Sequence, residues 1–175
     1  MTGGPGSGKT TLCEALANQG ISIIAESGRA IIREQVVCGG TALPWHDPQA
    51  FASAMMTRDL EQYQAALQRN CCCLFDRGFP DIAGYLTMLG RDVPSGLDRL
   101  CRTQRFDEPV FVAPPWPAIY AQDKERKQDW DEAVRTYHAV IAAYHHYGYA
   151  TIELPLVPVA QRADFMLEMI GAGRG

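Results

Sequence analysis

The sequence predicts an α/β protein in which helices cover both faces of a parallel sheet. Short apolar runs alternate with segments whose apolar residues recur at helical spacing, which is the pattern of successive βα units. Residues 3–10 read Gly-Gly-Pro-Gly-Ser-Gly-Lys-Thr and fill the pattern G-x-x-x-x-G-K-[ST], the Walker A phosphate-binding loop. These two observations indicate a P-loop NTPase, and the length of 175 residues suits a single domain.

Each residue type in the loop has a physical role in holding a nucleoside triphosphate. The glycines let the backbone take positive φ angles, so that successive amide groups converge on an anion. Lys9 is expected to reach the β- and γ-phosphates and the hydroxyl of Thr10 to ligate Mg²⁺. A glycine-rich turn that only caps a helix would require neither residue. The predicted ATP contacts of the loop are Gly4, Pro5, Gly6, Ser7, Gly8, Lys9, Thr10 and Thr11.

The other elements follow in order along the chain. A buried strand is expected before the loop, yet only Met1 and Thr2 precede it, so the first strand is truncated in this numbering. Apolar runs predict further strands at about 21–25, 71–75, 109–113 and 149–154. Helical periodicity and capping pairs such as Asp47-Pro48 predict helices at about 10–17, 27–37, 48–68, 81–89, 95–104, 130–144 and 159–170.

Candidate catalytic residues stand at the ends of predicted strands, because ligands of parallel sheets bind beyond the carboxyl ends of the strands. Asp76 follows an apolar strand and is a candidate Walker B carboxylate for Mg²⁺. Its neighbour Arg77 suits a phosphate or acceptor oxygen, whereas a motor ATPase normally places a second acid there. The alternative is that Asp76 caps a helix and Arg77 lies on the surface.

Glu26 stands at the end of the second predicted strand. It is a candidate general base that takes a proton from an acceptor hydroxyl, and Arg29 and Arg33 on the following helix would face the same acceptor. The alternative is a solvated cluster of these three side chains, which would contribute little energy.

The chain has three lysines, and two of them flank Arg126 in the charged stretch at about 121–129. A lid carrying Lys124, Arg126 and Lys127 would neutralise charge during phosphoryl transfer, with Arg126 the main contact, although a solvated helix start has a similar composition. Pro158 follows the last strand, where a flat apolar wall would contact a nucleobase.

Composition limits the classes of function. The net charge is −4 and no basic stripe dominates, which argues against nucleic-acid binding. No apolar run is long enough to span a membrane. The six cysteines have no zinc spacing and are expected to be reduced and buried, so a cytoplasmic protein without a membrane partner is expected.

The set of motifs at 2–11, 26–29, 76–78 and 111–116 resembles the small AAA-type ATPases that are grouped with the ATP-binding domain of NadR-like ribosylnicotinamide kinases. The similarity spans nearly the whole chain. It implies a kinase-like sheet of five strands in the order 2-3-1-4-5, with a lid after the fourth strand. It also implies a nucleoside or nucleotide kinase, in which Glu26 and the Asp76-Arg77 pair occupy the catalytic positions.

The sequence therefore predicts an ATP- and Mg²⁺-dependent phosphotransferase that acts on a small nucleoside- or nucleotide-like acceptor. Lys9, Glu26, Asp76, Arg77 and Arg126 are the predicted catalytic residues. The alternative is an ATPase or a nucleotide-switched regulatory protein without a small-molecule acceptor. A GTPase is disfavoured, because neither Asn18 nor Asn70 starts an N-K-x-D segment.

Overall fold

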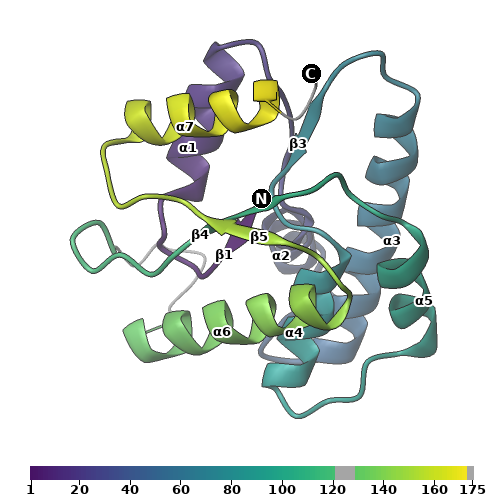
Figure 1. Ribbon diagram of the computed structural model, residues 1–175. Coiled ribbons are helices and arrows are strands. Elements are labelled where there is room, and N and C mark those ends of the chain that lie inside the picture. Colours follow the sequence, from purple (N-terminus) through teal and green to yellow (C-terminus); the bar gives the residue numbers. More distant parts are fainter. Residues whose placement is uncertain (121–128, 173–175) are drawn as a thin grey trace.

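Five short strands, all parallel, lie at the centre of the computed structural model, which describes residues 1–120 and 129–172. The strands are β1 (Thr2–Gly3), β2 (Ser22–Ile24), β3 (Cys73–Phe75), β4 (Val110–Ala113) and β5 (Thr151–Glu153). The helices are α1 (Lys9–Asn18), α2 (Ser27–Cys38), α3 (Pro48–Leu67), α4 (Phe79–Met88), α5 (Ser95–Thr103), α6 (Trp130–His146) and α7 (Val159–Ala172). Figure 1 shows the strands between two groups of helices. The predicted α/β fold with helices on both faces is confirmed.

The expectation of one continuous five-stranded sheet is wrong in detail. The strands form a three-stranded sheet in the order β1-β4-β5 and a two-stranded sheet of β2 and β3. The amino group of Met1 donates to the Phe75 carbonyl at 2.8 Å, and the Arg77 amide donates to the Met1 carbonyl at 2.8 Å, so β1 still lies beside β3. The spatial order is thus 2-3-1-4-5, but β1 has only two residues and is too short for a ladder with β3.

A cavity of about 770 Å³ lies beside Met1 where β1 is short. Its walls include residues 71–75, which contain β3, and residues 108–111, which lead into β4. Among the described residues, the space between β3 and β4 is therefore occupied by a strand only at Thr2–Gly3 and is open beside Met1.

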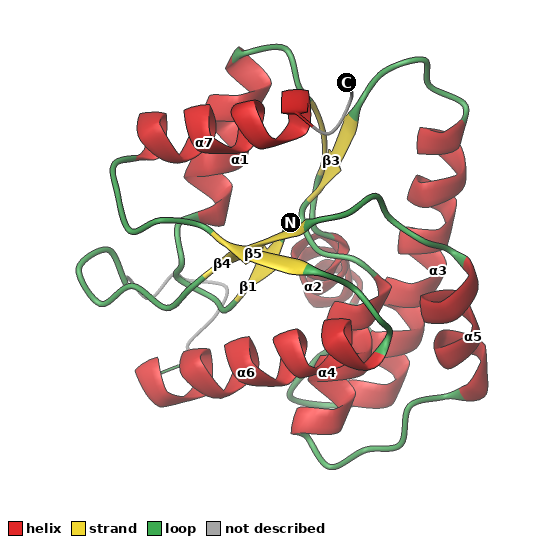
Figure 2. Ribbon diagram, in the orientation of Figure 1, coloured by secondary structure: helices red, strands yellow, loops and turns green. Residues whose placement is uncertain are grey.

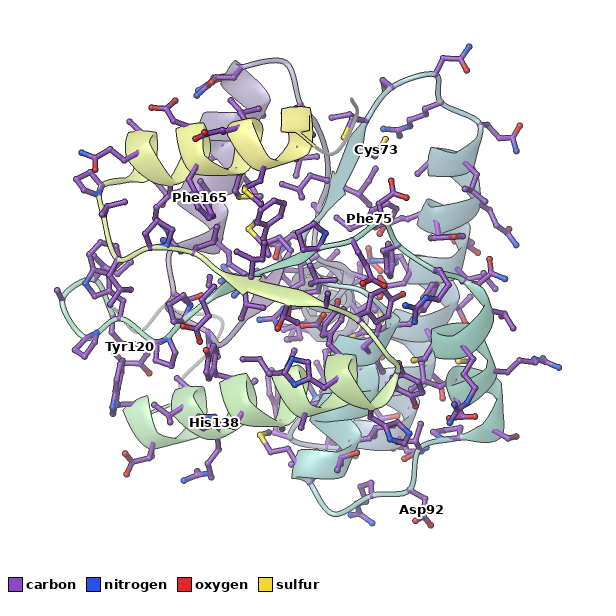
Figure 3. The ribbon with its side chains drawn as sticks, viewed as in Figure 1. Cys73, Phe75, Asp92, Tyr120, His138 and Phe165 are labelled. Atoms are coloured by element: carbon purple, nitrogen blue, oxygen red, sulfur yellow. The ribbon has the colours of Figure 1, made fainter. Side chains whose placement is uncertain are left out.

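The two faces of the sheets pack against different helices. On one face, Leu12 and Leu16 of α1 and Met166 of α7 are fully buried against the strands. On the other, Phe79 of α4 and Val140 of α6 belong to a separate core. Figure 2 shows α1 and α7 together on one side of the strands and α4 and α6 on the other, and in Figure 3 the labelled Phe165 marks the α7 side. Alternation along the strands explains this division, since neighbouring residues point to opposite faces.

Four further expectations concern the helices, the lid, the cysteines and membrane-spanning segments. The predicted helices are all present within the described residues, with bounds shifted by a few residues. The proposed lid at 121–129 lies, apart from Asp129, outside the described residues. Cys13 and Cys101 are buried, whereas Cys38 and Cys71 are exposed, so the expectation that the cysteines are buried holds only in part. No described helix is both long enough and apolar enough to cross a membrane.

Candidate functional site

The Walker A segment joins β1 to the amino end of α1 and turns through two left-handed glycines. Gly6 has φ 71° and Gly8, the N-cap of α1, has φ 79°. Residues with a Cβ rarely adopt these angles, so glycine is required at both positions for this turn. The turn directs the loop amides and the amino end of α1 to the same place, which is the arrangement that binds anions.

Lys9 folds back over the loop. Its Nζ donates to the carbonyls of Gly3 at 3.0 Å and Gly4 at 2.7 Å and lies 3.3 Å from the Ser7 hydroxyl. The residue is 6% exposed. The oxygens that hold the ammonium in these three contacts are uncharged, so an entering phosphate would be a stronger partner for the lysine.

Arg162 of α7 supports the loop by a hydrogen bond to its backbone. The sequence did not indicate it as a site residue. Its Nη1 donates to the Ser7 carbonyl at 3.1 Å, and its guanidinium carbon lies 5.8 Å from the centre of the Trp116 ring. The residue is 2% exposed, and burial lowers the pKa of its guanidinium. A signal was present: Arg162 lies four residues before the fully buried Met166, on the face of α7 that packs on the sheet.

Asp76 follows β3, and its amide donates to the Ile24 carbonyl at 2.9 Å. Its Oδ1 is buried and has no hydrogen-bond partner in the structure. Burial, followed by the negative charge of Asp76, raises the pKa of the Cys13 thiol on α1 to about 12, so the carboxylate lies near the first turns of that helix. Thr10 is exposed on the same helix. A buried carboxylate oxygen without a hydrogen-bond partner and a threonine hydroxyl on α1 are both oxygen ligands of the kind that Mg²⁺ prefers.

Glu26 and Arg77 lie together at the ends of β2 and β3. Arg77 has φ 77°, and its Nε lies 3.2 Å from Glu26 Oε1. The Nε of Arg29 lies 3.7 Å from Glu26 Oε2, whereas Arg33 is exposed. The Glu26 side chain is only 10% exposed. Because of this burial, the interpretation of Glu26 as part of a solvated surface cluster does not fit the structure.

Asp81 anchors this arrangement. Its Oδ1 accepts hydrogen bonds from Thr2 Oγ1 at 2.5 Å and Arg77 Nη1 at 2.9 Å, and its Oδ2 accepts from the Gly78 amide at 3.0 Å and the Tyr144 hydroxyl at 2.8 Å. The carboxylate thus connects β1, α4 and α6 and holds the Arg77 guanidinium. In the sequence, Asp81 was only the expected start of a helix.

A cavity of about 340 Å³ adjoins the loop between α2, α3, α4 and α6. Pro5 of the loop lines it, as do Glu26, Arg77 and Asp81. Its other walls are Ile32, Pro44, Trp45, Phe51, Met55, Asp59, Gly78, Ile82, Tyr85, Glu132, Thr136 and Val140. The candidate base and the phosphate loop therefore line one cavity of ligand size.

The buried polar atoms without partners gather around the loop and this cavity. Among the described residues, buried side-chain nitrogen and oxygen atoms without a hydrogen bond belong to Asp76, Tyr85 and Arg162, and also to Arg77, whose Nε is ion-paired with Glu26 instead. Folded proteins satisfy nearly all such groups, so each exception calls for an explanation. Their concentration here marks a place where a polar ligand would complete the hydrogen bonding.

The segment after β4 reaches the loop. A Cβ added to Gly6 would lie 2.5 Å from the Tyr120 ring, and one added to Gly8 would lie 2.9 Å from Ile119 Cδ1. The Tyr120 and Trp130 rings meet edge to face at 5.2 Å, and Figure 3 labels Tyr120 beside the start of α6. The residues on both sides of 121–128 thus lie close to the loop.

Of the other predicted ATP contacts, Thr11 and Pro158 are exposed to solvent, and Arg126 lies outside the described residues. Thr11 is exposed on the first turn of α1. Pro158 is exposed just before α7, and its carbonyl accepts the Arg162 amide at 3.1 Å. Arg126 lies outside the described residues, so its role stays a prediction.

The carboxyl of Asp59 on α3, which lines the cavity, makes the free energy of unfolding depend on pH. Burial raises the pKa of its carboxyl to about 6, and a hydrogen bond with Ser27 opposes this only in part. The folded state therefore holds this proton more tightly than the unfolded state between about pH 4 and 6, and stability contributed by the protonated form is lost as pH rises through that window. We expect Asp59→Asn to flatten this fall, by up to about 2–3 kcal/mol.

Urea unfolding from pH 4 to 7 measures this effect. Asp98→Asn is the matched control, because Arg102 lowers the pKa of Asp98 from its ordinary value of 3.8, so that this carboxyl titrates mainly below the measured range and its removal should leave the slope there nearly unchanged. The same slope in Asp59→Asn and in the unaltered protein would contradict the prediction.

Comparisons with known proteins agree with this architecture. The family model of the AAA domain matches residues 1–162. Shikimate kinase from Acinetobacter baumannii, solved in complex with shikimate, superposes with a TM-score of 0.57 at 17% sequence identity, covering 98% of this chain and 91% of that chain. At this identity the likeness concerns the fold, which is that of a P-loop kinase. No curated protein matches the sequence significantly. The chain belongs to the AAA domain family, with a kinase-like P-loop fold.

Proposed function

We propose that the protein transfers the γ-phosphoryl group of ATP, with Mg²⁺, to a hydroxyl of a small nucleoside- or nucleotide-like acceptor. The observation that carries the proposal is the cavity of about 340 Å³ that adjoins the phosphate loop at Pro5 and contains Glu26 and Arg77. A plain ATPase needs space for water only. The fold shared with a kinase that was solved with a small molecule bound supports the same proposal.

The loop residues would hold the donor. The amides of Gly4, Gly6, Ser7 and Gly8 and the Lys9 ammonium bind the phosphates, and Arg162 keeps the Ser7 carbonyl in place. Thr10 and Asp76 would hold Mg²⁺, which neutralises charge on the transferring group. Arg126 would add a positive charge from the segment after β4.

The cavity residues would prepare the acceptor. Glu26 accepts the proton of the attacking hydroxyl while the bond from the γ-phosphorus to the bridging oxygen breaks and ADP leaves. Arg77 is ion-paired with both Glu26 and Asp81, and it thereby fixes the orientation of the Glu26 carboxylate. Positioning of the two reactants accounts for most of the expected acceleration.

The proposal is tested by measuring ADP formation with MgATP and a panel of nucleosides, nucleotides and polyols. We expect turnover with one acceptor class at a rate well above that with buffer alone. Slow phosphate release at the same rate in every well would overturn the kinase proposal and favour a nucleotide-switched regulatory protein.

Arg162→Met tests the support of the loop. Methionine keeps the volume of the apolar stem but removes the donor to Ser7 and a cation near the phosphates, so we expect MgATP affinity to fall about tenfold. Calorimetry measures the affinity. The thermal midpoint is not expected to fall, because a poorly paired buried charge costs stability. Unchanged affinity would show that Arg162 has only a packing role.

A further inference from the structure

Two thiols lie close together at the start of β3. Cys71 is exposed at a bend of the chain, and Cys73 is the first residue of the strand, where Figure 3 labels it. The Sγ of Cys73 lies 3.8 Å from the Cys71 carbonyl oxygen, so this side chain turns back toward residue 71. Partial desolvation, followed by a hydrogen bond with Cys73, raises the pKa of the Cys71 thiol. The two thiols are therefore within reach of each other.

The spacing of these thiols suits a disulfide. On an extended chain, residues two apart share a face, whereas Cys72 between them points to the other. Two residues along a strand separate the Cα atoms by about 6.6 Å, which is near the upper limit of about 6.8 Å for a disulfide. The bend at Cys71 shortens this path. A disulfide near that limit is readily reduced, so we expect its formation to be reversible.

The wall beside the pair has room for a reagent and a positive charge. Residues 71–73 and Arg69 line the cavity of about 770 Å³ next to Met1. The Nη1 of Arg69 donates to Ser22 Oγ at 2.9 Å, and no carboxylate among the described residues forms an ion pair with this guanidinium. Its charge acts on the Cys71 thiol in the direction that favours the thiolate. A cation at this place also favours the approach of an anionic reagent.

The other cysteines lack this arrangement. Cys13 on α1 and Cys101 on α5 are buried, and burial raises the pKa of each thiol to about 12. Cys38 at the end of α2 is exposed, but its thiol contacts the Gln35 carbonyl at 3.7 Å and not a second thiol. Cys38 therefore serves as an internal reference for an exposed single cysteine.

We infer that Cys71 and Cys73 form a thiol–disulfide exchange site for a small anionic disulfide of the glutathione type. The Cys71 thiolate attacks one sulfur of glutathione disulfide, the disulfide bond of the reagent breaks, and one glutathione leaves. The Cys73 thiolate then attacks the Cys71 sulfur and releases the second glutathione. The two thiol protons pass to the departing thiolates, so the protein loses two electrons and glutathione disulfide is reduced. This inference is independent of the proposed phosphoryl transfer.

The second step distinguishes the pair from a single exposed thiol. One residue separates the two cysteines, so Cys73 reacts with the adduct on Cys71 within the same molecule. Its effective concentration is at least about millimolar, as for groups joined by a short linker. The adduct on Cys71 should therefore be short-lived, whereas the adduct on Cys38 should persist.

Mass spectrometry of the whole protein after treatment with glutathione disulfide tests the inference. The reaction is stopped with acid, and the protein is digested and mapped. We expect the peptide with residues 71–73 to lose two hydrogens and to carry no glutathionyl group, the Cys38 peptide to keep one, and dithiothreitol to reverse both changes. A lasting glutathionyl group on Cys71, or no disulfide in that peptide, would overturn the inference.

Serine variants identify the two partners. Cys73→Ser should stop the reaction at the mixed disulfide on Cys71, because the resolving thiol is absent. Cys72→Ser is the matched control and should form the disulfide at the rate of the unaltered protein. Disulfide formation that survives Cys73→Ser or is lost in Cys72→Ser would show that the pairing is different from the one inferred.

The charge of Arg69 is tested with two reagents of opposite sign. At low ionic strength, Arg69→Met should slow disulfide formation by glutathione disulfide several-fold but not by cystamine, which is cationic. Arg91→Met removes an exposed cation after α4 and should change neither rate. An equal effect of Arg69→Met on both reagents would contradict the assignment of an anionic disulfide to this site.

Discussion

Lys9→Ala is expected to lower phosphoryl transfer about 10³-fold and MgATP affinity at least about tenfold. The ammonium would contact the transferring phosphates, and loss of one charged donor at such a position typically has an effect of this size. In the structure, the same group holds three oxygens of the loop, so its loss also loosens the empty loop. Calorimetry with MgATP and the ADP-formation assay measure the two effects.

The control for Lys9→Ala removes a cation elsewhere. Arg102→Ala takes away an exposed guanidinium of α5 that pairs with Asp98 and lies over the Tyr147 ring. This variant should bind MgATP normally. A fall in thermal midpoint that is larger for Lys9→Ala, together with unchanged nucleotide affinity, would mean that the lysine serves only to hold the loop carbonyls.

Glu26→Gln is expected to slow transfer about 10²–10³-fold while MgATP affinity stays the same. Glutamine keeps the shape and a partner for Arg77 but cannot accept the hydroxyl proton, and general-base catalysis contributes an effect of this order. Single-turnover kinetics measure the chemical step, and calorimetry measures the affinity.

Glu34→Gln is the matched control, because it makes the same change on α2 at an exposed position paired with Arg58. Weakened nucleotide binding in Glu26→Gln, with transfer otherwise intact, would show that Glu26 is structural.

The sequence was sufficient for the parts of the site that depend on neighbours along the chain. The Walker A loop is local, so its residues, its left-handed turns and the helix that follows could be predicted together. The alternation of strands and helices gave the fold class. Glu26 and Arg77 were found by a positional rule, and the structure brings them together, although their roles stay predictions.

Residues that act through tertiary contacts could not be predicted in this way. In the sequence, Asp81 is only an acidic residue at a helix start. Its hydrogen bonds with Thr2 and Tyr144 come from distant segments and exist only in the folded protein. In the sequence, Arg162 is only a basic residue in the last helix. Its contact with the Ser7 carbonyl forms because α7 packs next to the loop. The contacts of these residues depend on the packing of distant elements, which the sequence alone does not give.

The position of Met1 has a practical consequence for anyone who labels or immobilises this protein. Its ammonium is buried, which lowers its pKa, and Thr2 alone separates it from the phosphate loop at 3–10. A purification tag joined at this end would convert the ammonium into an amide and begin in the space between β3 and β4. Apolar, β-branched leader residues would extend β1 between β3 and β4, away from the phosphate loop at its other end, whereas polar or bulky residues would fit that space poorly.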